Sequence, residues 1–314
     1  MPKPCLSQVA TMQIRPAVMR FPEDRLAALP RIGSMPIQSI LFREQPALAL
    51  SLPSGDRAVV ALHGAHLLSW TTADGVERVY LSPAALFDGQ SAIRGGVPVC
   101  WPQFNQRGPL PKHGFARNLP WAAAPAGPET KPGDLTLVLR DDDTTRALWP
   151  HAFDLRLTIS LTPGSLRLTL SVLNTDSAPW SFAAALHSYL HVDDIADVRL
   201  EGLQSAKRWD SVRNERHVEM AESLHFDAEF DSVYGAPAAP LKLVQPSGTL
   251  QIAQSASCTE TVVWNPGAAL SQKMVDLPDD GYRHMLCVEA ARIDENVLLA
   301  PGAQWLGWQQ LTVL

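Results

Sequence analysis

Alternation of apolar and polar residues is the feature that most restricts the fold of this 314-residue chain. From Phe153 to Leu161 every second residue is apolar, and the same period returns from Leu166 to Val172. The sequence Thr-Pro-Gly-Ser at 162–165 separates the two runs and is typical of a tight turn. Because side chains alternate between the two faces of a strand, this stretch predicts a β-hairpin with one apolar face.

Turn chemistry of the same kind recurs at 53–56 and at 246–248, each time between alternating segments. Helical periodicity is poor, and only 83–87 and 268–276 have the composition for a turn or two of helix. With 26 prolines and 19 glycines as spacers, many short strands predict an all-β fold, either a sandwich or a closed barrel.

The chain divides by composition into two parts. Residues 1–35 contain four methionines, and three basic residues precede their first acid, Glu23. We expect them to form a poorly ordered N-terminal extension. No linker composition interrupts 36–314, which we expect to fold as a single domain. The chain has no run of about 18 apolar residues and no CxxC pair among its four cysteines, so we expect a cytoplasmic protein.

Net charge limits the possible partners. A formal charge of −6 and a pI near 5.8 argue against binding to nucleic acid or to an anionic membrane, which would need a broad basic surface. An anionic ligand must therefore be met by a local cluster of cations. We expect a small-molecule ligand, no nucleic-acid or membrane partner, and a monomer.

Such a cluster occurs between Ser91 and Trp121, where Gly-Gly, Val-Pro, Trp-Pro and Leu-Pro breaks exclude a long helix or a central strand. The segment carries the cationic candidates Arg94, Lys112, His113 and Arg117. A structured loop that holds these side chains in fixed directions suits a small anion.

Three further short segments contain candidate residues: His187 in AAALHSYL, Asp231 in HFDAEFDSVY and Glu289 in MLCVEAARI. A carboxylate inside an apolar strand is costly to bury unless it has a partner or a function, so Glu289 is either a salt-bridged structural acid or a functional one. His187 is likewise either a satisfied core histidine or a catalyst. The spacing of His187 and His191 fits a metal site, but no third ligand lies nearby and we expect no metal.

Other catalytic signatures are missing from the sequence, which has no GxSxG elbow, no P-loop and no GxGxxG motif after a strand. Cys100 in VPVCWP could act as a nucleophile paired with His113. An inert buried cysteine is the alternative that we favour, because no helix N-terminus is there to lower its pKa.

Taken together, the blocks IRGGVPVCWPQF, LPKHGFARNLPW, LHSYLHV, VVWNPG and CVEAA resemble those of the hexose-6-phosphate mutarotases, or glucose-6-phosphate 1-epimerases, within the aldose 1-epimerase superfamily. The resemblance implies a galactose-mutarotase-like β-supersandwich and a cofactor-free exchange of the α and β anomers of glucose 6-phosphate. It also implies that His187 and Glu289 are catalytic, that Arg94 and Arg117 contact phosphate or sugar, and that Asp231 binds the sugar. Lys112 and His113 are further substrate-binding candidates.

The implied reaction needs one group that accepts a proton and one that donates a proton. The resemblance makes Glu289 the base and His187 the acid, and we expect nearby negative charge to keep His187 protonated. We also expect the two side chains to lie on opposite sides of one hexose. Two other functions stay open from the sequence, namely a non-catalytic carbohydrate-binding module and a mutarotase for unphosphorylated aldoses.

Overall fold

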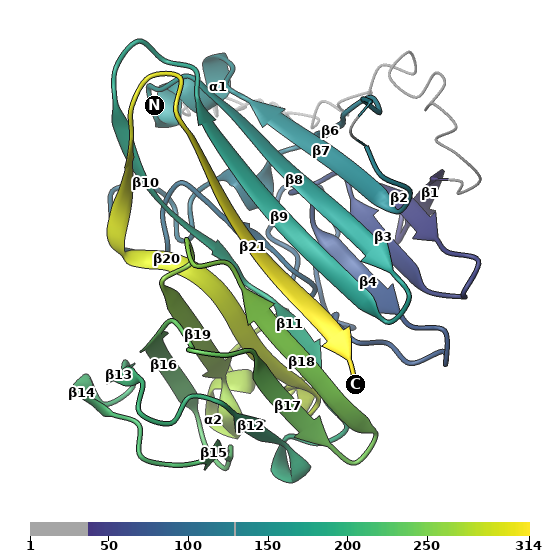
Figure 1. Ribbon diagram of the computed structural model, residues 1–314, viewed down its shortest axis with the longest axis vertical. Coiled ribbons are helices and arrows are strands. Elements are labelled where there is room, and N and C mark those ends of the chain that lie inside the picture. Colours follow the sequence, from purple (N-terminus) through teal and green to yellow (C-terminus); the bar gives the residue numbers. More distant parts are fainter. Residues whose placement is uncertain (1–36, 129) are drawn as a thin grey trace, which may run out of the picture. The chain divides into compact units, whose positions relative to one another are not determined.

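The computed structural model describes residues 37–128 and 130–314 (Figure 1). The prediction of a poorly ordered extension at 1–35 lies outside the described residues. In the described part of the chain no helix has the length and the apolar composition that a membrane crossing needs. Antiparallel strands predominate over helices among these residues, so the all-β prediction is confirmed.

The first sheet runs in the order β1-β2-β3-β4. Its strands follow one another in the sequence through short turns, and they are β1 (Gln38–Phe42), β2 (Gln45–Ser51), β3 (Arg57–Ala61) and β4 (Leu67–Thr71). The predicted turn at 53–56 joins β2 to β3, with Ser51 opposite Arg57.

A second sheet, which we call the β20 sheet, has the order β14-β13-β16-β19-β20-β10-β5, and β11 also pairs with β20. Strand β20 is long enough to pair with β10 along one part and with β11 along another. The strands are β5 (Val99–Cys100), β10 (Trp180–Leu186), β11 (Tyr189–His191), β13 (Lys207–Asp210), β14 (Glu215–Val218), β16 (Phe230–Gly235), β19 (Glu260–Asn265) and β20 (Met285–Leu299).

The third sheet, the β21 sheet, has the order β15-β12-β17-β18-β21-β9-β8-β7-β6. Figure 1 shows β20 and β21 in yellow, joined by a short turn and belonging to different sheets. The strands are β6 (Ala122–Ala123), β7 (Asp134–Arg140), β8 (Phe153–Thr162), β9 (Ser165–Asn174), β12 (Arg199–Glu201), β15 (Ser223–Leu224), β17 (Leu241–Gln245), β18 (Gly248–Gln254) and β21 (Gln304–Val313).

The predicted hairpins are confirmed. In β8 and β9, Thr162 pairs with Ser165 across the expected turn, and the alternate apolar residues of β9 are buried. The turn at 246–248 likewise joins β17 to β18. These hairpins could be predicted because a strand with one buried face alternates strictly and its turn residues are local.

Helices are short: α1 (Asp143–Leu148), α2 (Gly267–Ser271), η2 (Ala116–Asn118), η3 (Ile195–Asp197) and η4 (Gly281–His284). The expected turn at 268–276 is α2, whereas 83–87 forms no helix. Helix α1 was missed, although Asp142 and Thr145 cap it reciprocally.

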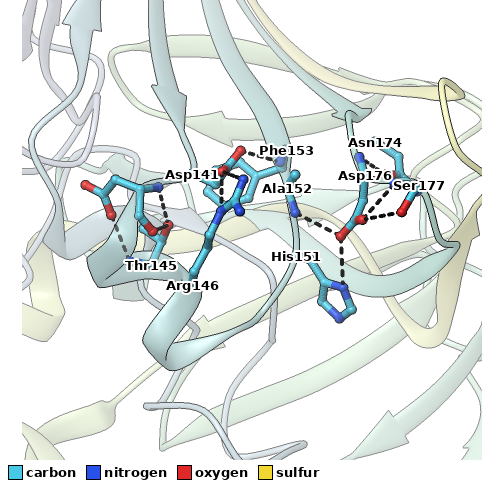
Figure 2. A network of polar contacts seen from close by, with 10 residues as sticks. Asp141, Thr145, Arg146, His151, Ala152, Phe153, Asn174, Asp176 and Ser177 are labelled. Carbon is cyan, nitrogen blue, oxygen red and sulfur yellow. Dashed lines mark hydrogen bonds and ion pairs between the residues drawn. The ribbon is translucent and has the colours of Figure 1, made fainter.

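Figure 2 shows how polar contacts hold α1 and its surroundings to the β21 sheet. Asp141 accepts hydrogen bonds from the backbone N–H of Phe153 (2.9 Å) and from Arg146 (2.7 Å). Nearby, Asp176 accepts from the backbone of Ala152 and lies 3.7 Å from His151 Nδ1. Each carboxylate accepts a backbone N–H from the segment that leads into β8, so the network is structural.

The β20 and β21 sheets are linked by a buried polar bridge. Gln309 on β21 is fully buried; its Oε1 accepts a hydrogen bond from the hydroxyl of Ser188, and its Nε2 donates to the carbonyl oxygen of Val288 at 2.9 Å. The backbone N–H of Val288 donates to the carbonyl oxygen of Ser188 at 3.1 Å, so Gln309 contacts two adjacent, hydrogen-bonded segments. This bridge therefore positions the backbone beside His187 and Glu289.

Replacing Gln309 by Met should lower the free energy of unfolding by about 1–3 kcal/mol, because a buried hydroxyl and a buried carbonyl lose their partner. Urea denaturation followed by circular dichroism measures this loss. The control is Gln304→Met, at an exposed position of the same strand, which should change stability by only about 0.5 kcal/mol. Equal losses in the two variants would contradict a special role for the bridge.

Candidate functional site

One face of the β20 sheet brings together candidates that are distant in sequence. In the register, Asp231 on β16 lies opposite Trp264, which lies opposite Cys287 on β20. Paired residues share a face, as do residues two apart on one strand, so Asp231 and Glu289 face the same way. His187 follows the last residue of β10, and Tyr189 of β11 pairs with Cys287.

His187 and Glu289 are in direct contact. His187 Nε2 lies 3.4 Å from Glu289 Oε1, and the two residues are only 8% and 1% exposed. His187 Nδ1 and Glu289 Oε2 are also buried, and neither has a hydrogen-bond partner within the described residues. Buried polar atoms are normally satisfied, so these two atoms are candidates for hydrogen bonds to a polar ligand.

The surroundings shift the two pKa values in opposite directions. Burial raises the pKa of Glu289 well above its ordinary value, and the negative charge of Asp231 raises it further. Burial lowers the pKa of His187, and the neighbouring His113 ring and the positive charges of Arg117 and Arg94 lower it further. The expectation that negative charge keeps His187 protonated is therefore wrong for the free protein: burial and two guanidinium groups lower the His187 pKa, and the one carboxyl group in contact with the imidazole, that of Glu289, has a raised pKa.

His113 lies beside the pair as a neutral imidazole. Its ring meets that of His187 edge-on at a centroid distance of 5.5 Å, and burial lowers its pKa to about 3. The backbone N–H of Asn105 donates to His113 Nδ1 at 3.3 Å, and the Cys100 sulfur lies 3.2 Å from the same atom. Since an amide N–H can only donate, Nδ1 carries no proton and Nε2 carries the N–H.

Cys100 is fully buried, and burial raises the pKa of its thiol. The contact with His113 exists as the sequence allowed, but a neutral thiol is a poor nucleophile. The geometry fits the inert cysteine, which donates its S–H to the imidazole.

Arg94 is held in one orientation by three contacts. Its Nε and Nη2 lie 3.2 and 3.1 Å from one oxygen of Asp276, and its Nη1 donates to the hydroxyl of Tyr189 at 2.8 Å. The backbone after Arg94 turns through Gly96 with φ +60°, where a Cβ would collide with the carbonyl oxygen of Leu67. A guanidinium has five N–H groups, so two stay available to a ligand.

Arg117 has a different environment. Its Nη2 donates to the backbone carbonyl of Lys112 at 2.9 Å, and its Nε is buried with no partner among the described residues. In the described part of the chain, no carboxylate pairs with Arg117, and the exposed side chain of Lys112 likewise has no acidic partner. Arg117 is thus the cation with more capacity left for an anion.

Asp231 is half-buried on the same face. Burial raises the pKa of its carboxyl group, and the carboxylate of Glu229 raises it further. Its backbone carbonyl accepts hydrogen bonds from the amide (2.9 Å) and the hydroxyl of Ser211. The seven predicted site residues therefore lie in one electrostatically connected region, in which charges on Arg94, Lys112, Arg117 and Asp231 act on the buried groups.

Two residues of this region were missed by the sequence reasoning. Tyr189 stacks on His187 at 4.9 Å with an angle of 11° between the ring planes. Its position two residues after His187 is a signal that could have found it. Asp276 gave no such signal, because it is 182 residues from Arg94 and only the fold makes them neighbours.

Within residues 37–128 and 130–314, no group of three or more His, Cys, Asp or Glu side chains is arranged to hold a metal ion. His191 lies on β11 opposite Met285, and its pKa is lowered mainly by burial.

An antiparallel β-sheet fold with a buried histidine–carboxylate contact close to arginine side chains is typical of the mutarotase class. Residues 46–312 match the model of the aldose 1-epimerase family. The chain belongs to the aldose 1-epimerase family, as the sequence blocks indicated.

Its relatives are more specific. A protein of Cenchrus ciliaris, described as a candidate glucose-6-phosphate 1-epimerase, is 36% identical over 262 residues, which are 80% of this chain and 79% of the relative. A relative from Escherichia coli K12 with the same description is 38% identical over 245 residues, covering 76% of this chain and 81% of its own.

Among solved structures, that of a candidate mutarotase from Salmonella typhimurium superposes with a TM-score of 0.77 at 31% identity. The match covers 89% of this chain and 96% of the other. The mutarotase-like fold implied by the sequence is thereby confirmed.

The tautomer of His113 can be tested directly. Nitrogen-15 NMR should show a protonated Nε2 and an unprotonated Nδ1 from pH 8 down to about pH 4, since the pKa is lowered to about 3. His284 is the internal control, because its Nδ1 lies 3.0 Å from the carbonyl oxygen of Asp193 and must donate. A protonated Nδ1 on His113 at neutral pH would contradict the assignment.

Proposed function

We propose that this protein is a glucose-6-phosphate 1-epimerase, which interconverts the α and β anomers of glucose 6-phosphate. The observation that carries the proposal is the buried contact of His187 with Glu289, with an unpartnered polar atom on each side chain. The names of the relatives from Cenchrus ciliaris and Escherichia coli support the same reaction and substrate.

The reaction breaks the bond between C1 and the ring oxygen. The C1 hydroxyl loses a proton, the ring oxygen gains one, and rotation about the C1–C2 bond precedes closure on the other face. Both oxygens are bonded to C1, so an acid and a base that lie side by side can serve them. The 3.4 Å contact leaves no room for a hexose between the two groups, so the expectation of opposite sides is wrong for these atoms.

Glu289 acts as the base toward the C1 hydroxyl and His187 as the acid toward the ring oxygen. Each role contributes about 10²–10⁴-fold to the rate. The opposed pKa shifts of the pair leave a single proton on it over a wide range of pH: below that range neither group can accept a proton, and above it neither can donate. Asp231 and His113 Nε2 bind sugar hydroxyls.

The phosphate binds to Arg94 and Arg117, and the exposed side chain of Lys112 is a further contact. A guanidinium presents N–H groups in a planar fork that matches phosphate oxygens, and charge-assisted hydrogen bonds are the stronger kind. Asp276 and Tyr189 hold the fork of Arg94 in place, which lowers the entropy lost on binding.

We propose further that the protein works in the cytoplasm, as a monomer without nucleic-acid or membrane partners. Cys100, Cys258 and Cys287 are buried and free, which fits a reducing compartment.

Replacing Glu289 by Gln should lower kcat by about 10³-fold or more, because the amide cannot accept the C1 proton. The KM should change little. Exchange NMR of the anomeric signals of glucose 6-phosphate measures both. The control is Glu295→Gln, an exposed position of the same strand, which should keep normal rates. Near-normal turnover by Glu289→Gln would overturn the mechanism.

Replacing Arg117 by Ala should raise KM for glucose 6-phosphate by about 10–100-fold, which corresponds to the loss of one or two charge-assisted hydrogen bonds. The same variant should change the KM for free glucose much less. Arg57→Ala, on the exposed end of β3, is the control. If both sugars were affected equally, the phosphate would have to bind elsewhere.

A further inference from the structure

The surroundings of the acid–base pair in the free protein disfavour the protonation state that the proposed roles need. The groups that act on His187 are positive or neutral, apart from Glu289 itself; they are His113, Arg117, Arg94 and the phenol of Tyr189. Glu289 is buried and also faces the negative charge of Asp231. These surroundings favour Glu289 as the holder of the pair's single proton, whereas Glu289 must be ionised to act as a base.

A short path connects the phosphate-binding cations to the imidazole. Arg94 donates to the hydroxyl of Tyr189 at 2.8 Å, and the phenol ring stacks on His187 at 4.9 Å. A phenol ring therefore separates the guanidinium from the imidazole. Because a hexose is of similar size, a sugar with C1 at the pair can place its C6 phosphate near Arg94.

All the groups on this path are fixed. Tyr189 is 3% exposed, and Arg94 and Asp276 have side chains that are only 26% and 19% exposed. The backbone carbonyl of Asp276 also accepts a 2.7 Å hydrogen bond from Ser82, which anchors its segment. Charges held at fixed positions in a poorly solvated region interact strongly. A change in net charge at Arg94 therefore changes the electrostatic potential at His187.

We propose that the substrate's phosphate switches the catalytic pair on: bound at Arg94 and Arg117, its negative charge offsets theirs and favours transfer of the pair's single proton from Glu289 to His187. This inference rests on the proposed function. The substrate thus supplies the negative charge near the imidazole that the free protein lacks.

The steps balance without any co-reactant. The proton leaves the carboxyl group of Glu289 and joins His187 Nε2, whose 3.4 Å contact tightens in the complex. Glu289 then takes the proton of the C1 hydroxyl, and the C1=O bond forms. The electron pair of the C1–O bond goes to the ring oxygen, which takes the proton from His187. Ring closure reverses every transfer.

A phosphate that contributed only to binding would lower KM and leave kcat unchanged. A phosphate that shifts the proton of the pair from Glu289 to His187 must raise kcat. It can do so without being covalently joined to the sugar. An Arg charge beside a titratable group changes its pKa by about 1–3 units. Each unit corresponds to a tenfold change in the population of the active protonation state.

The test uses the intact protein and exchange NMR of saturating glucose, with and without inorganic phosphite, with potassium chloride at matched ionic strength as the control. Glucose alone should turn over about 100-fold more slowly than glucose 6-phosphate, and phosphite should accelerate glucose exchange in a saturable way. The activation ratio, which is the rate with phosphite over the rate without, should fall to about one in Arg94→Met and persist in Arg57→Met.

Two outcomes separate this inference from the proposed function. If glucose 6-phosphate exchanges rapidly but phosphite leaves glucose exchange unchanged or inhibits it, the switch is wrong and the epimerase function stands. If the protein does not accelerate the exchange of glucose 6-phosphate at all, the proposed function itself fails.

Discussion

The buried contact between His187 and Glu289 is the interaction on which the rest of the site depends. Taking a carboxyl group to 1% exposure is costly, and here only part of that cost is offset, because one oxygen has no partner among the described residues. The β20 sheet enforces the arrangement, since β10 and β11 both pair with the strand that carries Glu289. In the proposed mechanism, a substrate supplies the hydrogen bonds that these unpartnered atoms lack.

The cations around this contact have two effects that oppose each other in the free protein. Arg94 and Arg117 offer N–H groups to an anion, yet their charge lowers the pKa of His187. In the proposed switch, an anionic substrate removes this conflict, because the charge that binds the cations also raises the pKa of the imidazole. Binding and chemistry are in this way coupled through electrostatics, with no movement of the backbone required.

The sequence predicted the elements whose signals are local. The β8–β9 hairpin follows from strict alternation and a Pro-Gly turn, and the site loop at 91–121 follows from its proline and glycine breaks. Helix α1 was missed because its signal is only the capping pair of Asp142 and Thr145. The candidate residues were found through their types and through the family blocks, since a carboxylate or an imidazole in an apolar strand is unusual.

Tertiary structure alone decided the charge environment of each group. His113 and Arg94 come from one loop segment, but only the fold turns them toward His187 and brings Asp276 onto Arg94 from 182 residues away. The direction of a pKa shift depends on burial and on the charges within a few ångströms, and neither is encoded locally. The sequence by itself therefore determined the strands, the turns and the chemical inventory of the site, while three-dimensional packing decided which group holds the proton, because charges act through space and not along the chain.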